Sequence, residues 1–177
     1  GAMGIEPGRP LIVAGSTAPL PGTPWGSEEA LLLRAVERVR TLGIDAQLLC
    51  APRKPEHFET AAAALPGCVR RTARRGTQGG GDAPGEPSPS GLYVLDTIGE
   101  LGHAYALADV VVIGRSFGRL YGSDPMEPVG LGRATIIGPL SARRVLIGLV
   151  MGEVISAPRF DREDIRAQGM QHGLGRI

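Results

Sequence analysis

Short apolar runs alternate along this chain with segments whose apolar residues recur at helical spacing. The first run, residues 10–14, lies between a proline and a glycine, which is typical of a buried parallel strand. The later segments predicted in this way are a strand at 46–51, a weak strand from Val69, two strands within 92–128, a strand at 133–139, and core segments at 145–150 and 153–155, followed by a polar helix from Asp161.

Two amphipathic helices are predicted in the first half of the chain. The longer one begins at Ser27, a good N-cap residue, and ends at Gly43, a natural C-terminal stop. Glu28 and Glu29 fall in its first turn, where the helix dipole favours carboxylates. The shorter helix covers residues 56–65. Strand, loop and helix thus repeat along the chain, and this alternation implies right-handed βαβ units.

The predicted fold is therefore α/β: a Rossmann-like three-layer domain with a parallel sheet between helices. Ligands of such sheets bind beyond the carboxyl ends of the strands. The candidate binding loops at that edge are residues 15–17, 52–54, 97–100, 114–116, 122–127 and 138–139.

Composition narrows the function classes. The net charge of +1 argues against a nucleic-acid partner, and 4% aromatic residues are too few for a base-stacking platform. Cys50 and Cys68 are expected to be reduced, buried thiols of a cytosolic protein. The sequence contains no GxGxxG or HExxH motif, no apolar run of transmembrane length and no signal peptide. His103 and His172 have no ligand partners at useful spacing, so no metal and no cofactor are expected.

The chain is expected to form one domain. The first four residues are interpreted as a tag remnant and linker, and residues 5–177 as a single Rossmann-like domain cut from a longer natural protein. Residues 76–90 are rich in Gly, Pro and Ser and are expected to form a flexible surface loop. Four arginines lie between Arg70 and Arg75. They could contact phosphate, but a solvated face is the favoured interpretation.

Arg53 is the first candidate for phosphate binding. It follows a predicted strand and is flanked by Pro52 and Pro55, which restrict the backbone around it. A guanidinium held there could bind a phosphate through two hydrogen bonds. An ordinary surface arginine is the alternative.

The turn from Thr97 to Glu100 permits two interpretations. In the structural one, Thr97 and Glu100 form a capping box at a helix N-terminus. In the functional one, the N–H groups of Ile98 and Gly99 bind an anion there, and the close approach of a ligand explains the glycine. The two interpretations are compatible.

Glu127 is the candidate for nucleoside binding. It lies between Pro125 and Pro128 at the end of a glycine-rich loop. A carboxylate can accept hydrogen bonds from both hydroxyls of a ribose, each contributing about 1.5–3 kcal/mol. A glutamate at an ordinary helix start is the alternative.

Five motifs in this order resemble the C-terminal domain of 3-deoxy-D-manno-octulosonic acid (Kdo) transferases. The resemblance extends over residues 10–139. The motifs are Ala-Gly-Ser-Thr at 14–17 with Glu28-Glu29, Pro52-Arg53 with the following Pro-Glu-x-Phe, Asp-Thr-Ile-Gly-Glu-Leu at 96–101, Tyr-Ala-Leu-Ala-Asp-Val at 105–110, and Gly-Ser-Asp-Pro-Met-Glu-Pro at 122–128.

The resemblance implies the C-terminal half of a GT-B glycosyltransferase. Such a domain binds the donor of an enzyme that transfers Kdo from CMP-Kdo to a lipid A precursor in lipopolysaccharide biosynthesis, without a catalytic metal. The catalytic base, the acceptor site and membrane association belong to an N-terminal part. The isolated domain is therefore expected to be inactive, and the whole enzyme to work at the cytoplasmic face of the bacterial inner membrane. The residues expected to contact CMP are Pro52, Arg53, Ile98, Gly99, Glu100, Asp124, Pro125, Met126 and Glu127, with Ser16 and Thr17 as weaker candidates.

This chain departs from the family pattern within the same loops. Arg115 stands where the family has glycine, and Ser123-Asp124 stands where it has His-Asn. Asp124 would add negative charge beside a phosphate-bearing ligand unless Arg115 or Arg53 offsets it. A non-catalytic nucleotide-binding or regulatory module, and a GT-B enzyme that uses another nucleotide sugar, are the alternative functions.

Overall fold

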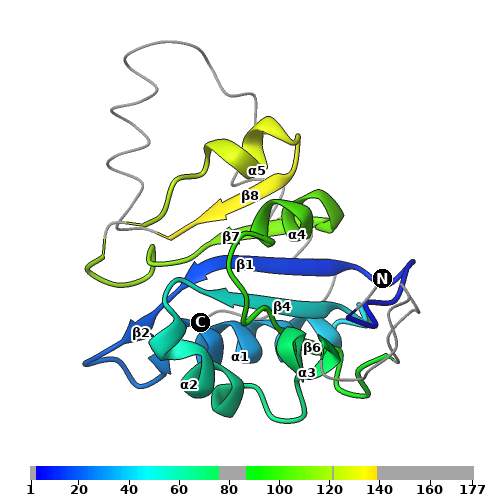
Figure 1. Cartoon of the computed structure of the whole chain (residues 1–177), viewed down its shortest axis with the longest axis horizontal. Coiled ribbons are helices and arrows are strands. Elements are labelled where there is room, and N and C mark those ends of the chain that lie inside the picture. Colours follow the sequence, from blue (N-terminus) through cyan, green and yellow to red (C-terminus); the bar gives the residue numbers. More distant parts are fainter. Residues whose placement is uncertain (1–2, 76–86, 121, 139–177) are drawn as a thin grey trace, which may run out of the picture.

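A six-stranded parallel sheet forms the centre of the fold, with the strand order β5-β6-β4-β1-β7-β8 (Figure 1). The structure is a computed structural model that describes residues 3–75, 87–120 and 122–138. The strands of the sheet are β1 (Leu11–Thr17), β4 (Gln47–Pro52), β5 (Val69–Arg70), β6 (Leu92–Val94), β7 (Val110–Ile113) and β8 (Ala134–Ile137), and β2 (Pro19–Leu20) forms a separate antiparallel pair with β3 (Gly26–Ser27).

Helices cover both faces of the sheet, which confirms the predicted α/β architecture. On one face, Leu32 and Val36 of α1 pack against the apolar side chains of β4 and β6. On the other face, Ala104 and Tyr105 of α4 pack against β1, β4 and β7, and α5 lies beside α4 and β8. The helices are α1 (Glu28–Thr41), the 3₁₀ turn η1 (Pro55–His57), α2 (Phe58–Ala64), α3 (Arg71–Arg75), α4 (Leu101–Leu107) and α5 (Met126–Gly130).

The chain changes direction across the sheet at β1. Residues 11–15 of β1 pair with residues 47–51 of β4 on one side, and residues 12–15 pair with residues 110–113 of β7 on the other. From β4 the chain continues outward to β5 and β6 before it returns to β7. The carboxyl ends of β1 and β7 therefore flank a topological switch point, where open α/β sheets bind their ligands.

Helix α1 begins as its sequence predicts. Ser27 is the N-cap, and its hydroxyl oxygen accepts a hydrogen bond from the N–H of Ala30 at 3.2 Å. Glu28 and Glu29 occupy the first turn but are buried, with 0% and 2% of their surfaces exposed. Because both carboxylates are buried, they accept hydrogen bonds from groups inside the protein in addition to facing the positive end of the helix dipole.

Two predicted elements differ in the structure. The expected helix at 56–65 is divided into η1 and α2, because Pro55 begins a 3₁₀ turn. The capping box at Thr97 is wrong: the N-cap of α4 is Glu100, whose side chain makes no capping hydrogen bond. The side chain of Glu100 accepts a hydrogen bond from the Thr97 hydroxyl and forms an ion pair with Arg71, which comes from a distant part of the chain.

Several other predictions can be compared with the structure only in part. Cys50 is buried and Cys68 half-buried, both as free thiols. No helix within residues 3–75, 87–120 and 122–138 has both the length and the apolar character needed to cross a membrane. Most of the loop at 76–90, the segments at 145–150 and 153–155, residue 139 and the tail from Asp161 lie outside the described residues.

Gly114, directly after β7, permits backbone contact with the last residues of β1. Its N–H donates to the carbonyl oxygen of Gly15 at 2.8 Å, and a Cβ atom added to it would lie 2.4 Å from the carbonyl oxygen of Ser16. That separation is far below a normal contact and involves backbone atoms, which cannot turn aside. The glycine is therefore required by the close packing of the β7 loop against the end of β1.

We predict that Gly114→Ala lowers the free energy of unfolding by about 1–3 kcal/mol, because the new methyl group forces the β7 loop away from the end of β1. Denaturant unfolding monitored by circular dichroism measures this change. Gly130→Ala is the matched control, since a Cβ atom at Gly130 meets nothing within 4 Å. Equal stability of the Gly114→Ala protein and the wild type would contradict the proposed packing constraint.

Candidate functional site

A groove opens at the carboxyl edge of the sheet, beside the switch point between β1 and β7. Its volume is about 1190 Å³. Three loops line it: residues 18–23 after β1, residues 53–57 after β4, and residues 115–120 after β7. We call it the basic groove because the charged or titratable side chains that line it are Arg53, Lys54, His57, Arg115 and Arg119.

The charges of the basic groove are largely uncompensated. In the described part of the chain, no carboxylate pairs with the side chains of Arg53, Arg115 or Arg119. Among the residues that the structure describes, Lys54 forms only an exposed ion pair, at 3.1 Å from Glu56, and none of those that line the groove is acidic. Several guanidinium groups around a concave surface favour an anionic ligand, and phosphate or carboxylate can accept two hydrogen bonds from each.

Glu28 holds the walls of the basic groove together. One carboxylate oxygen accepts from the N–H groups of Ala18 at 3.0 Å and Arg115 at 2.7 Å. The other accepts from the N–H groups of Ser116 at 3.1 Å and Phe117 at 3.4 Å. Burial raises the pKa of Glu28, while the donated N–H groups act in the opposite direction. This side chain thus ties α1 to the loops after β1 and β7.

The hydroxyl groups near the switch point serve the fold. Thr17 is fully buried, and its hydroxyl donates to the carboxylate of Glu29. Ser116 is also fully buried. Its hydroxyl donates to the carbonyl oxygen of Ile113 and accepts from the N–H of Gly138. Ser16 is 7% exposed and has an unusual positive φ of 59°. The predicted role of Thr17 at a phosphate therefore has no free hydroxyl to support it.

The predicted anion site at Ile98 and Gly99 has a different geometry from the one expected. Both residues precede α4, whose N-cap is Glu100, so their N–H groups are not those of its first turn. Gly99 has a φ of +89°, and nothing lies within 4 Å of the position of a Cβ atom there. The turn conformation itself explains this glycine, so the expected close approach of a ligand is not needed. The side chain of Ile98 is 71% exposed.

Ion pairs hold the turn before α4 in place. The guanidinium of Arg71 donates to both carboxylate oxygens of Glu100, at 3.0 and 3.2 Å. Asp96 accepts from the N–H of Thr72 and from Arg70 Nε, each at 2.8 Å. The solvated face expected for Arg70 and Arg71 is thus wrong, because both arginines bind carboxylates on neighbouring elements. Glu100 is already engaged by a cation, which competes with its predicted contact with CMP.

Glu127 lies on α5 and faces α4. A Cβ atom at Gly102 of α4 would lie 2.5 Å from Glu127 Oε1, so the glycine makes room for this carboxylate. Burial, and then the charge of Glu127, raise the pKa of Tyr105 to about 12. The Tyr105 hydroxyl in turn lies against Gly15, at the end of β1. Glu127 is exposed and therefore accessible to a ligand at the same edge of the sheet.

Asp124 has a local structural role in the same loop. Its carboxylate accepts from the N–H of Met126 at 2.9 Å, at the start of α5. Asp124 and Met126 are exposed, and Pro125 is half-buried. The charge that Asp124 adds is thereby partly stabilised by a backbone donor.

The structure brings some of the predicted residues together and separates others. Arg53 joins Arg115 at the basic groove, and Pro52 immediately precedes Arg53 at the end of β4. The turn at Ile98 and the α5 segment at Glu127 belong to other loops and do not line the groove. His57 and Arg119 also line the groove, although the sequence pattern predicts an exposed, unremarkable His57 and no role for Arg119. The Nδ1 of His57 is buried without a hydrogen-bond partner among the described residues. The loops after β4 and β7 lie far apart in the sequence, so nothing in the sequence indicates that they line the same groove.

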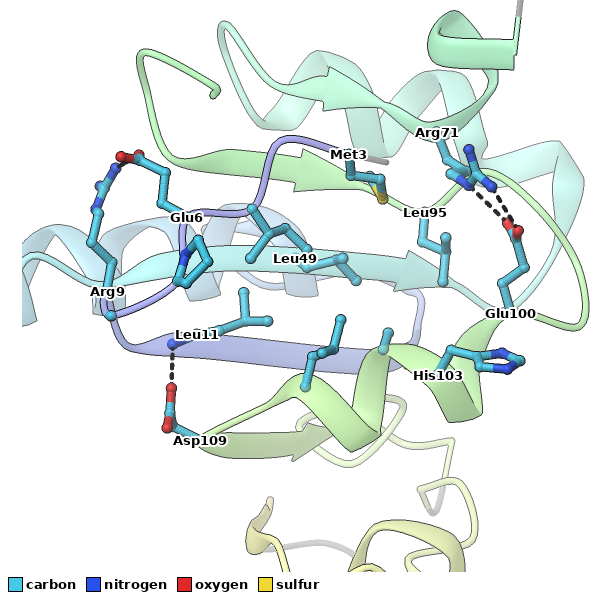
Figure 2. A pocket seen from close by; sticks show the side chains of 15 residues that line it. Met3, Glu6, Arg9, Leu11, Leu49, Arg71, Leu95, Glu100, His103 and Asp109 are labelled. Atoms are coloured by element: carbon cyan, nitrogen blue, oxygen red, sulfur yellow. Dashed lines mark hydrogen bonds and ion pairs between the residues drawn. The ribbon is translucent and has the colours of Figure 1, made fainter. Parts of the chain in front are cut away.

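A second cavity of about 480 Å³ lies on the face of the sheet, between residues 3–9 and α4. Its floor is apolar and includes Leu11, Leu49 and Leu95 (Figure 2). Figure 2 shows the ion pair of Arg71 with Glu100 at one end. This cavity has fewer unpaired cations than the basic groove and lies away from the switch point, so it is the weaker candidate for an anionic ligand. No group of three metal-ligating side chains occurs within the described ranges.

Curated proteins similar to this chain share one name. The chain is 35% identical over 136 residues to the 3-deoxy-D-manno-octulosonic acid transferase of Bordetella pertussis, and the match covers 75% of this chain and 29% of that protein. Proteins of the same name from Haemophilus influenzae and Rickettsia bellii are 27% and 24% identical over 130 and 131 residues. The chain thus spans less than a third of the length of these relatives. No protein-family model matches it.

A solved structure has the same fold. It is the crystal structure of the C-terminal CMP-Kdo binding domain of WaaA from Acinetobacter baumannii, with a TM-score of 0.60 and 23% sequence identity. The similarity covers 81% of this chain and 69% of the solved chain. It confirms the Rossmann-like α/β fold inferred from the pattern of strands and helices.

The carboxylate of Asp96 gives a pH dependence that can be measured. Burial alone would raise its pKa, but hydrogen bonds from Thr72 and the guanidinium of Arg70 outweigh burial and hold the pKa below its usual value. The carboxylate therefore stabilises the fold above the pKa of the unfolded state, near 4, and this contribution is lost as the pH falls through the lower folded-state pKa.

We predict that Asp96→Asn lowers the free energy of unfolding by about 1–3 kcal/mol at pH 7, and that the difference from wild type narrows below about pH 4. Denaturant unfolding across this pH range gives both values. Asp45→Asn is the control, because Asp45 pairs with Arg9 at an exposed position. A difference between wild type and Asp96→Asn that is independent of pH would contradict the assigned role of Asp96.

Proposed function

This chain is a homologue of the 3-deoxy-D-manno-octulosonic acid (Kdo) transferases, and on that premise we propose that it is the donor-binding domain of such an enzyme. It would bind the CMP portion of CMP-Kdo. The observation that carries the proposal is the 35% identity over 136 residues to the Bordetella pertussis transferase. The basic groove supports it, because an uncompensated set of cations lies where parallel sheets bind their ligands.

Arg53 is the proposed phosphate ligand. It lies on the wall of the basic groove directly after β4, with its backbone N–H donating to the carbonyl oxygen of Thr17 at 2.9 Å. This hydrogen bond fixes the backbone of Arg53 against the end of β1. A guanidinium so placed stabilises the charge that develops on the phosphate as CMP leaves the sugar, and this electrostatic effect lowers the barrier to transfer.

Glu127 is the proposed ligand of the ribose. Its carboxylate is exposed beside Gly102, and no cation pairs with it in the described part of the chain. Ribose hydroxyls could therefore donate to it without displacing a partner. The segment 124–126 before Glu127 would complete the nucleoside side of the site. Ile98, Gly99 and Glu100 before α4 would lie on the phosphate side, together with Pro52.

The whole enzyme is proposed to be a GT-B glycosyltransferase. Residues 5–177 would form its donor-binding domain, and another part of the protein would supply the catalytic base, the binding site for a lipid A precursor and the association with the cytoplasmic face of the inner membrane. The 177-residue chain alone is then expected to bind nucleotide without transferring Kdo, because half of the cleft is absent.

Calorimetric titration with CMP, UMP and UDP tests the proposed function. We predict that CMP binds most tightly. Arg53→Ala and Glu127→Ala should each weaken CMP binding at least about tenfold, which corresponds to about 1.4 kcal/mol, because each variant removes one charged ligand.

Two exposed positions on α1 supply matched controls: Arg34→Ala removes an arginine and Glu37→Ala a glutamate. Both should leave the affinity for CMP unchanged. Preference for UDP would favour an enzyme that uses another nucleotide sugar. The absence of binding by any of the three nucleotides, or an unchanged affinity in both site variants, would refute the proposal as stated.

A further inference from the structure

The β7 side of the basic groove carries two arginines that the phosphate does not require. Arg115 and Arg119 both line the groove, on a different loop from Arg53. Neither pairs with a carboxylate in the described part of the chain. Like charges concentrated in one cavity repel one another and destabilise the folded chain. An anion bound between them would remove that repulsion, so these residues point to a second anionic group on the ligand.

The backbone at Arg115 supports a binding role. Its φ is +61°, in the left-handed region that residues other than glycine, asparagine and aspartate rarely adopt. The N–H of Arg115 is held by Glu28 at 2.7 Å, which fixes this conformation. Strained residues persist where the surrounding structure holds them in place, and they cluster at active sites and ligand clamps.

The proposed donor carries two different anions. One is the phosphate that links cytidine to the sugar, and the other is the carboxylate of the ulosonic acid itself. The groove offers cations on two sides: Arg53 with Lys54 and His57 after β4, and Arg115 with Arg119 after β7. Phe117 and Leu20 line the space between the loops and supply apolar contacts suited to the carbon face of a sugar ring.

We propose that Arg115 and Arg119 bind the carboxylate of the donor sugar, while Arg53 binds the phosphate. This inference rests on the proposed function and makes the two arginines specificity residues: they distinguish a CMP-linked ulosonic acid from a nucleotide linked to a neutral sugar. A guanidinium suits this task because its planar pair of N–H donors matches the two oxygens of a carboxylate.

The test compares CMP, freshly prepared CMP-Kdo and CDP as calorimetric ligands of the 177-residue chain. The first variant is Arg115→Gly, which removes the guanidinium while keeping a residue that readily adopts the positive φ. The second is Arg119→Ala at an exposed position. Arg53→Ala serves as the comparison for loss of the phosphate ligand, and Arg34→Ala as the surface control. Circular dichroism confirms that each variant is folded.

We expect Arg115→Gly and Arg119→Ala to weaken CMP-Kdo binding at least about tenfold each while changing CMP affinity by less than about threefold. Arg53→Ala should weaken both ligands. Equal losses of affinity for CMP and CMP-Kdo in the two variants would overturn the inference, because the arginines would then bind the phosphate. An unchanged affinity for both ligands would overturn it as well.

Tighter binding of CDP than of CMP, abolished in the two variants, would also overturn it by identifying a second phosphate as the ligand. Failure of wild type to bind CMP and CMP-Kdo would refute the proposed function together with the inference. Binding of CMP by wild type without discrimination by the variants would refute the inference alone.

Discussion

The hydrogen bonds of Glu28 are the constraint on which the carboxyl edge of this fold depends. A single carboxylate accepts backbone N–H groups from Ala18 and from the loop at residues 115–117, so α1, β1 and β7 meet at one buried charge. The charge has no cationic partner among these contacts and is stabilised by oriented N–H donors. Without it, each buried donor would lose its acceptor at a cost of about 1–3 kcal/mol. The close approach at Gly114 and the positive φ of Arg115 belong to the same arrangement.

This arrangement determines how the groove can bind an anion. In many nucleotide-binding proteins a glycine-rich loop presents its backbone N–H groups to the phosphate. Here the N–H groups of residues 115–117 are directed to an internal carboxylate. Side-chain guanidinium groups are therefore left to bind the ligand, and the groove contains three of them from two different loops. Glu28 thus acts on binding through the position of the Arg115 loop, without contacting a ligand.

The strands and helices that are marked by a local pattern of apolar residues could be predicted from the sequence. The strands at β1, β4 and β8 and the start of α1 at Ser27 follow from short buried runs and a good N-cap. The capping box predicted at Thr97 is absent because α4 begins at Glu100. The Glu100 carboxylate accepts from the Thr97 hydroxyl and also from Arg71, 29 positions away, a tertiary contact that local spacing does not reveal. The position of Glu28 and Glu29 in a first turn predicts contact with the helix dipole, but a charged pair there gives no sign that it will be buried. The composition of the basic groove likewise depends on the β4 and β7 loops meeting across β1.

The nucleotide is proposed to bind at the basic groove whose loops Glu28 holds together. Titration of the isotope-labelled chain with CMP, followed by backbone amide chemical shifts in NMR spectra, tests it most directly. We predict the largest shifts at Arg53 and at residues 115–120, with further shifts at the start of α5. Shifts concentrated in residues 3–11 and 103–109, around the second cavity, would contradict it.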